Sequence, residues 1–505
     1  MKRKIVSLLL GGALLLTGAT SMACTGTIVG RQVAKDGHTI LGRTEDYSSA
    51  YNKNIIVTPR KEYKNGEMFE DANGLRLPQP RVSYKFTSIP DGYQDEGEVF
   101  DAAGFNEFGV SMTATVTAYA HEKAYAADPL TKNGLTESSI TGIVLPRVKT
   151  AREGIELVAK ICDEHGSSEG NIIFISDQKE TWYMEMLTGH QYVAIKYPED
   201  CFSVVPNCYM LGTVDVNDKE NVIASKDLIN LPKKHGFLVE EDGKIHVRKT
   251  YAEKLNDYNR SRLWGGINFL DKDKNIAYDA EEFELFQKTD KKISVKDVME
   301  MQRHRYEGTK YDANLAENEN VRAIGTINQE ECHVLEVRED YPRELGGIMW
   351  VAMGNSEHSI YVPVIGGILD TIDEYKVTGN YYKPESAYWT LRGVSALSEL
   401  NREKYGKNVR AYWNKEELRL LEEQKSVDNI IKEMYKTDRN RAIEYATCLA
   451  KKNLTKAYED GQTLFTELMT YFYRDSGKKQ DKPYEPSLVG GEMAGDAPLE
   501  EAVKH

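Results

Sequence analysis

The chain carries the stretch Cys24-Thr25-Gly26-Thr27-Ile28-Val29-Gly30, followed by Leu41-Gly42-Arg43-Thr44-Glu45-Asp46. Both runs have the character of β-strands. The pair Asp36-Gly37 lies between them, and it is a strong signal for the turn of a hairpin. The stretch therefore predicts a β-hairpin near the start of the chain.

The register of this hairpin decides which side chains lie opposite one another. A loop from Val33 to Gly37 places Asp46 opposite Cys24, whereas a two-residue turn at Asp36-Gly37 shifts the pairing. In either register, Cys24, Arg43 and Asp46 share one hairpin. The sequence leaves the choice between the two registers open.

Residues 1–23 are organised like a secretory signal peptide. The basic segment Lys2-Arg3-Lys4 precedes an apolar run from Ile5 to Leu16, and Ser21-Met22-Ala23 offers small residues at positions −3 and −1 of a cleavage site. We expect cleavage after Ala23, either by signal peptidase or by autocatalytic removal of a propeptide. The mature protein is then expected to be secreted or to reside in the cell envelope.

Cleavage after Ala23 makes Cys24 the new N-terminus, so that one residue carries both a thiol and a free α-amine. The reference pKa of an α-amine is about 7.7–8.0, which allows it to act as a base near neutral pH. A thiol beside its own base is a nucleophile–base pair. Two other interpretations stay open: a lipoprotein with a diacylglycerol anchor on this thiol, and a structural cysteine. Lipoprotein sites usually have Leu at −3, where this chain has Ser21.

The composition is that of an ordinary soluble globular protein. The chain has 505 residues, 40% hydrophobic and 29% charged, with a formal net charge of −14. This length suits one large domain with a subdomain, or two or three domains. The acidic balance argues against a nucleic-acid partner. After the signal peptide no apolar run reaches about 18 residues, so we expect no transmembrane span.

The cysteine spacing argues against a zinc site. No CxxC pair occurs among the six cysteines, which are Cys24, Cys162, Cys201, Cys208, Cys332 and Cys448. One or two disulfides fit an exported protein, but a core of this size does not require them. The sequence leaves open whether the protein forms a homo-oligomer.

The order of predicted elements indicates a mixed α+β class. Beyond the hairpin, we predict strands at 110–116, 171–176, 181–185, 192–196, 332–337, 348–353 and 360–364, and helices at 138–151 and 154–164. Pro363 indicates a sheet edge or a strand end. Apolar residues at helical spacing, such as Val427, Ile430, Ile431 and Met434, predict a helical C-terminal region. We place the main domain at 24–390, the helical region at 391–475 and a disordered tail at 476–505.

The quoted stretch resembles the N-terminal nucleophile (Ntn) cysteine hydrolases, specifically the PepD-type dipeptidases, with choloylglycine hydrolases and penicillin V acylases as more distant relatives. The resemblance covers about residues 24 to 400. It implies a four-layer αββα sandwich, to which the C-terminal helices are an appendage. Further matching segments follow in the family's order: Asn106-Glu107-Phe108-Gly109-Val110, Glu169-Gly170-Asn171, Asp177, Trp182-Tyr183-Met184-Glu185, Gly189-His190, Asn259-Arg260-Ser261-Arg262-Leu263-Trp264, Met349-Trp350-Val351-Ala352 and Tyr361-Val362-Pro363.

The resemblance implies roles for three residues of the hairpin. Cys24 is the implied nucleophile, and its α-amine accepts the thiol proton and later returns it to the leaving amine. Arg43 lies beside the thiol in relatives, where a guanidinium favours the thiolate. Asp46 holds the nucleophile's amine. Read without the resemblance, Arg43 would be an ordinary ion-pair partner and Asp46 a turn or cap residue.

Two further residues are implied outside the hairpin. Asn207 matches the asparagine whose amide donates to the oxyanion, a contribution worth about 10²–10³ in rate, although an asparagine in a loop is usually a turn former. Arg262 matches an arginine that orients the site, with Arg260 as the alternative. The chain departs from the acylases at the second oxyanion position, in the strand 111–117, where a threonine hydroxyl or a backbone N–H could serve. This departure favours a dipeptidase-like member.

The function implied by the resemblance is that of an exported cysteine dipeptidase. It would hydrolyse short peptides through a thioester acyl-enzyme, with no metal and no organic cofactor. One alternative keeps the fold and changes the substrate to N-acyl amino acids, bile-salt conjugates or penicillin V. Another is a binding lipoprotein anchored through Cys24, which excludes catalysis because an acylated thiol cannot attack a carbonyl carbon.

Overall fold

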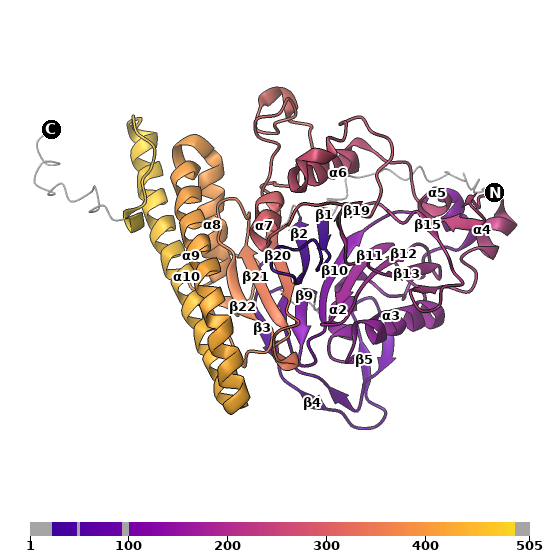
Figure 1. The fold of residues 1–505 in the computed structure, drawn as a ribbon. Coiled ribbons are helices and arrows are strands. Elements are labelled where there is room, and N and C mark those ends of the chain that lie inside the picture. The colour runs from indigo at the N-terminus through magenta and orange to yellow at the C-terminus, as the bar shows by residue number, and fades with distance from the viewer. Residues whose placement is uncertain (1–22, 48–50, 93–99, 490–505) are drawn as a thin grey trace, which may run out of the picture.

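The computed structural model describes residues 23–47, 51–92 and 100–489, with residues 114–116 as backbone only. Within this part of the chain, two large antiparallel sheets form the body of the molecule (Figure 1). One has the strand order β19-β14-β1-β2-β20-β21-β22. Its strands are β1 Ala23–Val29, β2 Thr39–Asp46, β14 Cys201–Val205, β19 Gln287–Lys288, β20 Gln329–Val337, β21 Gly347–Met353 and β22 Val362–Ile365.

The second sheet has the order β16-β13-β12-β11-β10-β9-β8-β3. Its strands are β3 Ile56–Thr58, β8 Phe86–Pro90, β9 Asp101–Asn106, β10 Ser111–Thr117, β11 Asn171–Ser176, β12 Thr181–Met186, β13 Tyr192–Lys196 and β16 Val222–Ala224. Short strands complete small sheets at the periphery: β4 Lys61–Glu62, β5 Met68–Glu70, β6 Arg76–Pro78, β7 Val82–Ser83, β15 Thr213–Val214, β17 Glu240–Glu241 and β18 Lys244–His246.

Helices cover both sheets. Helices α2 and α3 pack on the second sheet, α6 and α7 pack on the first, and the long α9 and α10 run beside β22 (Figure 1). The α-helices are α1 Glu122–Ala127, α2 Glu137–Val144, α3 Ala151–His165, α4 Asn230–His235, α5 Val247–Tyr251, α6 Asp257–Leu270, α7 Val295–Gln302, α8 Ala387–Leu400, α9 Lys407–Thr437 and α10 Arg439–Gly477.

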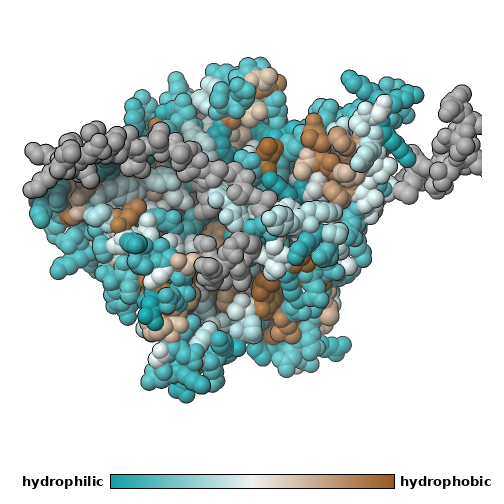
Figure 2. Space-filling model, turned by 180° about the vertical axis from the view of Figure 1, so that it is seen from behind, coloured by the Kyte–Doolittle hydropathy of each residue, from teal (hydrophilic) through white to brown (hydrophobic). Residues whose placement is uncertain are grey.

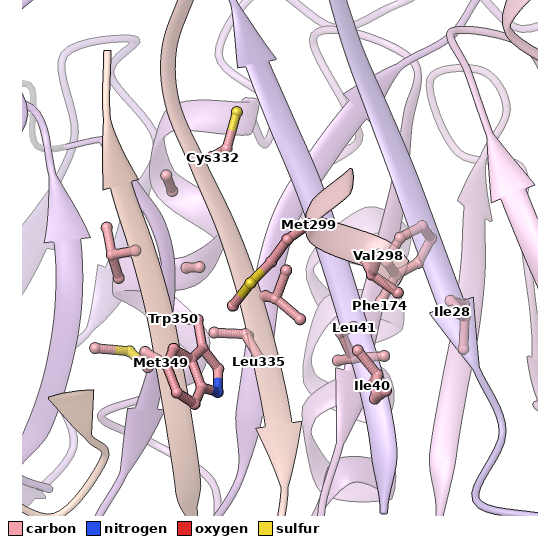
Figure 3. Packing of buried hydrophobic residues seen from close by; sticks show 14 of the residues in the cluster. Ile28, Ile40, Leu41, Phe174, Val298, Met299, Cys332, Leu335, Met349 and Trp350 are labelled. Atoms are coloured by element: carbon pink, nitrogen blue, oxygen red, sulfur yellow. The ribbon is translucent and has the colours of Figure 1, made fainter. Parts of the chain in front are cut away.

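The largest hydrophobic cluster connects the two sheets and the helices on the first. It includes Ile28 of β1, Leu41 of β2, Phe174 of β11 and Val298 of α7, all at most 1% exposed (Figure 3). Burying an aliphatic side chain of this size contributes about 1.5–3 kcal/mol. A Cβ at Gly42 would lie 2.9 Å from Cγ1 of Val298, so a glycine is required where α7 packs on β2. Strands β1 and β2 are therefore buried along their whole length.

The hairpin forms as predicted, but its register differs by one residue from the one in which Asp46 lies opposite Cys24. Cys24 pairs with Glu45, and Asp46 pairs with Ala23. Because side chains alternate between the faces of a strand, this shift places Asp46 on the face opposite to the Cys24 thiol. Glu45 takes the place beside the thiol.

The connection between β1 and β2 explains the shift. The ladder already ends at the pair of Val29 with Ile40, so the connection is longer than the predicted loop. Ala34 forms a bridge with Ile293, which lies far along the chain. Gly37 has φ of +74°, in agreement with the predicted turn. The turn residues were recognised correctly, but a distant tertiary contact sets the length of the loop.

Most predicted strands are confirmed within a few residues, and one predicted helix is wrong in length. Strands β11 and β13 have the predicted bounds, and Pro363 lies on β22, an edge strand of its sheet. The predicted helix at 138–151 ends at Val144, and a new helix begins at Ala151. Pro146 disfavours continuation, and the Thr150 side chain caps the N-terminus of α3 by accepting from the backbone N–H of Glu153 at 3.1 Å.

The C-terminal helical region forms as predicted, but part of the predicted disordered tail is ordered. Tyr484 is 4% exposed. Its hydroxyl donates to Oε2 of Glu467 at 2.6 Å, and its carbonyl accepts from Nδ2 of Asn408 at 2.7 Å. The segment 478–489 thus returns along the long helices, while residues 490–505 lie outside the described part.

The structure bears on the expectations about membrane spans and disulfides, but not on the expected signal peptide. None of the described helices combines the length and apolarity that crossing a membrane would need. All six cysteines lie in the described part of the chain, and none of them forms a disulfide there. The face seen in Figure 2 is mostly hydrophilic, with scattered apolar residues. Residues 1–22 lie outside the described part, so the signal peptide stays a prediction.

Candidate active site

The β1–β2 register places three functional groups on one face of the hairpin. Cys24 lies opposite Glu45, and Arg43 lies opposite Gly26. Gly26 has no side chain, which leaves the space between Arg43 and Cys24 open along this face. Nη2 of Arg43 consequently reaches Sγ of Cys24 at 2.9 Å.

Arg43 is held by two buried carboxylates. Its Nη1 donates to Oε2 of Glu45 at 3.1 Å, and its Nη2 donates to Oε1 of Glu137 at 3.0 Å. Arg43 is fully buried, and both carboxylates are 2% exposed. Lys53, itself 1% exposed, forms a further ion pair with Glu45. Removing one partner from such a buried cluster costs about 3–5 kcal/mol, so the cluster fixes the guanidinium beside the thiol.

The Cys24 thiol is protonated at neutral pH in the chain that still carries Ala23. Burial raises the pKa of Cys24 to about 12, and although Arg43 acts to lower it, Glu137 and Glu45 act with burial to raise it. Arg43 therefore favours the thiolate, as expected, but does not outweigh burial. The thiol needs a base that removes its proton during the reaction.

This pKa predicts the pH dependence of alkylation at Cys24 in the chain that retains Ala23. The thiolate is the reacting form, and below the pKa its fraction rises about tenfold per pH unit. We expect the rate of labelling by iodoacetamide, followed by mass spectrometry, to increase in this way from pH 7 to pH 10. Labelling of the exposed Cys448 in the same sample is the internal reference. A rate at Cys24 that levels off below pH 9 would contradict the assignment.

Asn207 reaches Cys24 because β14 pairs with β1. Val205 lies opposite Gly26, so the chain that leaves β14 runs past the start of β1. Oδ1 of Asn207 accepts from the backbone N–H of Cys24 at 3.2 Å, and its Nδ2 donates to the carbonyl of Thr117 at 2.8 Å. The structure thus brings Asn207 to the backbone nitrogen of the predicted nucleophile.

Asp46 lies on the opposite face of the hairpin, beside Ala23. It forms an ion pair with Arg322, and its Oδ1 is buried without a hydrogen bond among the described residues. Burial raises the pKa of Asp46, although Arg322 and Arg262 act to lower it. No hydrogen bond joins Asp46 to Cys24 in these described residues, so contact with the amine is not part of this state.

Arg262 holds the backbone of the nucleophile from α6. Its Nη1 donates to the carbonyl of Cys24 at 2.6 Å and to Oγ1 of Thr25 at 3.2 Å, and its Nη2 donates to Oδ1 of Asn259 at 2.6 Å. Burial and the nearby Arg322 lower the pKa of Arg262 to about 10, which keeps it charged at neutral pH. The alternative residue, Arg260, instead donates to the carbonyl of Ala280 at 3.1 Å.

This difference predicts unequal effects of two matched substitutions. Arg262→Lys removes the fork that reaches Cys24, Thr25 and Asn259 together. Because hydrogen bonds to charged groups are worth about 1.5–3 kcal/mol each, we expect the free energy of unfolding to fall by about 2–4 kcal/mol and kcat to fall at least tenfold. Arg260→Lys should change both much less. Urea unfolding and kcat measurements check this, and equal effects would contradict the placement of Arg262.

Comparison with known proteins gives the family. The model of peptidase family C69 matches residues 23–415, a range that begins one residue before Cys24. The chain belongs to peptidase family C69.

Several proteins of similar sequence carry dipeptidase names. Probable dipeptidase B of Streptococcus pyogenes serotype M1 is 44% identical over 406 residues, which cover 77% of this chain and 81% of the relative. A probable dipeptidase of Salmonella dublin is 34% identical over 354 residues, or 69% and 82% of the two chains. A solved mutant of conjugated bile acid hydrolase from Clostridium perfringens aligns with a TM-score of 0.28 and 13% identity, over 65% of this chain and 89% of that one. Family and relatives support a cysteine dipeptidase.

Four charged residues around the predicted nucleophile were not predicted from the sequence: Glu45, Lys53, Glu137 and Arg322. Glu45 lies inside the quoted stretch, and the correct hairpin register would have identified it. Glu137 lies 94 residues from its partner Arg43, and no local pattern marks it. Only the tertiary fold joins such partners.

The sequence leaves the second oxyanion donor open between a threonine hydroxyl and a backbone N–H of the strand 111–117. In β10, the hydroxyl of Thr117 donates to Oε2 of Glu137 at 2.8 Å, and Oγ1 of Thr113 lies 2.8 Å from Nε2 of His333. These two hydroxyls therefore have structural partners. The side chains of residues 114–116 lie outside the described part.

One group in the described part of the chain has the residue types of a metal site. Ligand atoms of Glu357, His358 and Glu399 lie within 4.8 Å of one another. Arg305 forms ion pairs with both carboxylates, and Arg402 forms another with Glu357. Because two arginines already neutralise these carboxylates, we interpret the group as an ion-pair network that joins α8 to the segment after β21.

Proposed function

We propose that the protein is an exported cysteine dipeptidase in which Cys24, as the N-terminal residue after removal of residues 1–23, attacks the peptide bond of short peptides. The observation that carries the proposal is the contact between Nη2 of Arg43 and Sγ of Cys24 at 2.9 Å. It joins the only hairpin cysteine to a buried charge cluster in a member of peptidase family C69. We also propose the four-layer αββα arrangement of the Ntn hydrolases, which the packing of α2 and α3 on one sheet and of α6 and α7 on the other supports.

The proposed reaction uses the thiol and the α-amine of one residue. Sγ of Cys24 attacks the carbonyl carbon of the peptide bond while the thiol proton passes to the amine. The C–N bond breaks, the amine gives the proton to the leaving nitrogen, and the acyl group stays on sulfur as a thioester. Water then attacks the thioester, the amine takes its proton, and the proton returns to sulfur as the C–S bond breaks.

The surrounding residues suit this use of the amine. The raised pKa of the buried thiol, about 12, means that a base must take the proton, and the amine of the same residue is the nearest candidate after cleavage. Asp46 lies opposite Ala23, and its buried Oδ1 accepts no hydrogen bond among the described residues. We propose that this oxygen accepts a hydrogen bond from the amine that forms when Ala23 is removed.

Asn207 supports the proposed oxyanion role only through its second amide hydrogen. An amide NH₂ group carries two donors, and in the present state one of them is used on the carbonyl of Thr117. The other is available to a substrate oxygen. Arg262 makes its contacts with protein atoms, so we propose that it positions the backbone of Cys24 and does not touch the substrate.

Burial of Cys24 favours the nucleophile over the lipid anchor. The thiol is fully buried and accepts from Arg43, and a diacylglycerol group on it would need the space that Arg43 and its two carboxylates occupy. Export to the cell exterior or envelope rests on the sequence of residues 1–23. Intact-mass analysis of protein from an exporting host tests both points, because cleavage leaves a free Cys24 and an anchor adds the mass of a diacylglycerol.

Substrate profiling of the mature chain tests the activity. We expect hydrolysis of unmodified dipeptides, retained in the presence of a chelator and lost after thiol alkylation. The panel should include N-acyl amino acids, a bile-salt conjugate and penicillin V. Cleavage of these compounds without cleavage of dipeptides would overturn the dipeptidase assignment and favour an acylase.

A further inference from the structure

A cavity of about 250 Å³ is connected to the predicted nucleophile through Asn207, which lines the cavity and contacts Cys24, whereas Cys24 itself is not a lining residue. Asn207 and Asn259 are among its lining residues. Asn207 contacts the backbone nitrogen of Cys24 at 3.2 Å, and Asn259 contacts Arg262, which in turn holds the carbonyl of Cys24. The volume is smaller than the about 300–1,000 Å³ of pockets for drug-sized ligands, so the cavity suits a small substrate of the reaction proposed above.

Two adjacent residues of opposite charge, Glu253 and Lys254, also line this cavity. Both are exposed, and no ion pair or side-chain hydrogen bond is found for either in the described part of the chain. Other surface carboxylates in the described part of the chain are paired, including Glu241 with Lys249 at 2.8 Å. An unpaired carboxylate and an unpaired ammonium group that face one small cavity are available to charges on a ligand.

The backbone around these residues is held in place. The N–H of Glu253 donates to the carbonyl of Tyr119 at 3.3 Å, and the preceding Ala252 forms a bridge with Ala120. Asn256 then caps α6, because its side chain accepts from the N–H of Asn259 at 3.0 Å. The two charges therefore start from a segment that is fixed on both sides.

Two tyrosine rings also line the cavity. Tyr119 is 50% exposed and Tyr258 is 38% exposed, and both belong to the cavity wall. The ring of Tyr258 also packs against the guanidinium of Arg262, 4.7 Å from its centroid. Such rings offer apolar contact area to the side chains of a peptide, with little conformational entropy to lose.

We propose that Glu253 and Lys254 are specificity residues that bind the two free termini of a zwitterionic dipeptide, Glu253 the ammonium group and Lys254 the carboxylate. In a dipeptide these two charges flank the single peptide bond, so one small cavity can hold both termini while the peptide bond lies toward Asn207 and Cys24. An N-acyl compound lacks the free ammonium group, and in a longer peptide the two terminal charges do not both flank the bond that is cleaved. This inference rests on the proposed dipeptidase function and assigns its substrate selection to two residues.

Three substrates and two substitutions test the inference: a dipeptide, its N-acetyl derivative and its C-terminal amide, each with Glu253→Gln and Lys254→Gln. In the unsubstituted protein, we expect each modification to lower kcat/KM about tenfold, the effect of losing one charge-assisted hydrogen bond. Glu253→Gln should remove the penalty for acetylation and keep that for amidation. Lys254→Gln should do the reverse. In both variants the loss with the unmodified dipeptide should appear mainly in KM.

Two matched controls separate this effect from a general change of surface charge. Glu240 and Lys226 are also exposed but do not line the cavity, so Glu240→Gln and Lys226→Gln should leave all three rates unchanged. If the protein hydrolyses dipeptides but Glu253→Gln and Lys254→Gln leave the ratios of kcat/KM among the three substrates unchanged, this inference is overturned and the proposed function stands. Failure of the unsubstituted protein to hydrolyse any dipeptide would overturn the proposed function as well.

Discussion

Cys24→Ala is expected to abolish dipeptide hydrolysis, with a loss in kcat on the order of 10⁴- to 10⁶-fold, as for other enzymes that lose their nucleophile. The substitution removes the only atom that forms the thioester, and nothing else in the cluster around Arg43 replaces it. Cys24→Ser keeps an oxygen nucleophile and should retain a small fraction of the activity. Initial rates on one dipeptide, with the N-terminus of each variant verified by mass, give the comparison.

Two other cysteines provide matched controls for Cys24→Ala. Cys208 lines the cavity beside Asn207, and Cys448 is exposed. Cys448→Ala should keep activity and its sensitivity to alkylation. Cys208→Ala should keep kcat and its sensitivity to alkylation and change only KM, because Cys208 lines the cavity proposed to bind the substrate. Full activity of Cys24→Ala, or loss of kcat in Cys448→Ala, would refute the assignment of the nucleophile.

Retention of a single residue before Cys24 is expected to lower kcat/KM by about 10²- to 10⁴-fold, the usual contribution of a general base. An amide nitrogen has no basic lone pair, so the thiol proton has no acceptor. In the structure, where Ala23 is still attached, burial raises the pKa of the Cys24 thiol to about 12, so the thiol does not lose its proton without a base. The extended chain should therefore hold a neutral, unreactive thiol at pH 7.

The experiment compares two chains that differ only at the N-terminus, one beginning at Cys24 and one with an additional residue that intact mass shows to be retained. Both should unfold at similar temperatures, because Ala23 contributes only one ladder position, opposite Asp46. Equal activity of the two chains would show that the amine is not the base. Loss of the extra residue with time and a parallel gain of activity would instead identify autocatalytic processing.

The sequence predicts those elements of the fold that are set by contacts between residues close together in the chain. The Asp36-Gly37 turn, the bounds of β11 and β13 and the edge position of β22 follow from short patterns of turn residues, alternation and proline. The division of the predicted helix at 138–151 was missed, although Pro146 and the cap at Thr150 are local signals for it. The order of the segment around Tyr484 was not predicted, because no local pattern marks its contacts. Tyr484 is held by Asn408, which is far away in the sequence, and by Glu467 of the preceding helix α10.

The sequence by itself determined that Cys24 and Arg43 share one hairpin and that this hairpin belongs to a C69-type chain. The tertiary structure alone decided the register, and with it that Glu45, and not Asp46, lies on the thiol face. It also brought Glu137 and Lys53 to the guanidinium cluster and distinguished Arg262 from Arg260. The physical reason is that a strand pattern has a period of two and fixes which residues share a face, whereas the pairing partner depends on loop length and distant contacts. Buried charges add a second reason, because each must find an opposite charge wherever the fold supplies one.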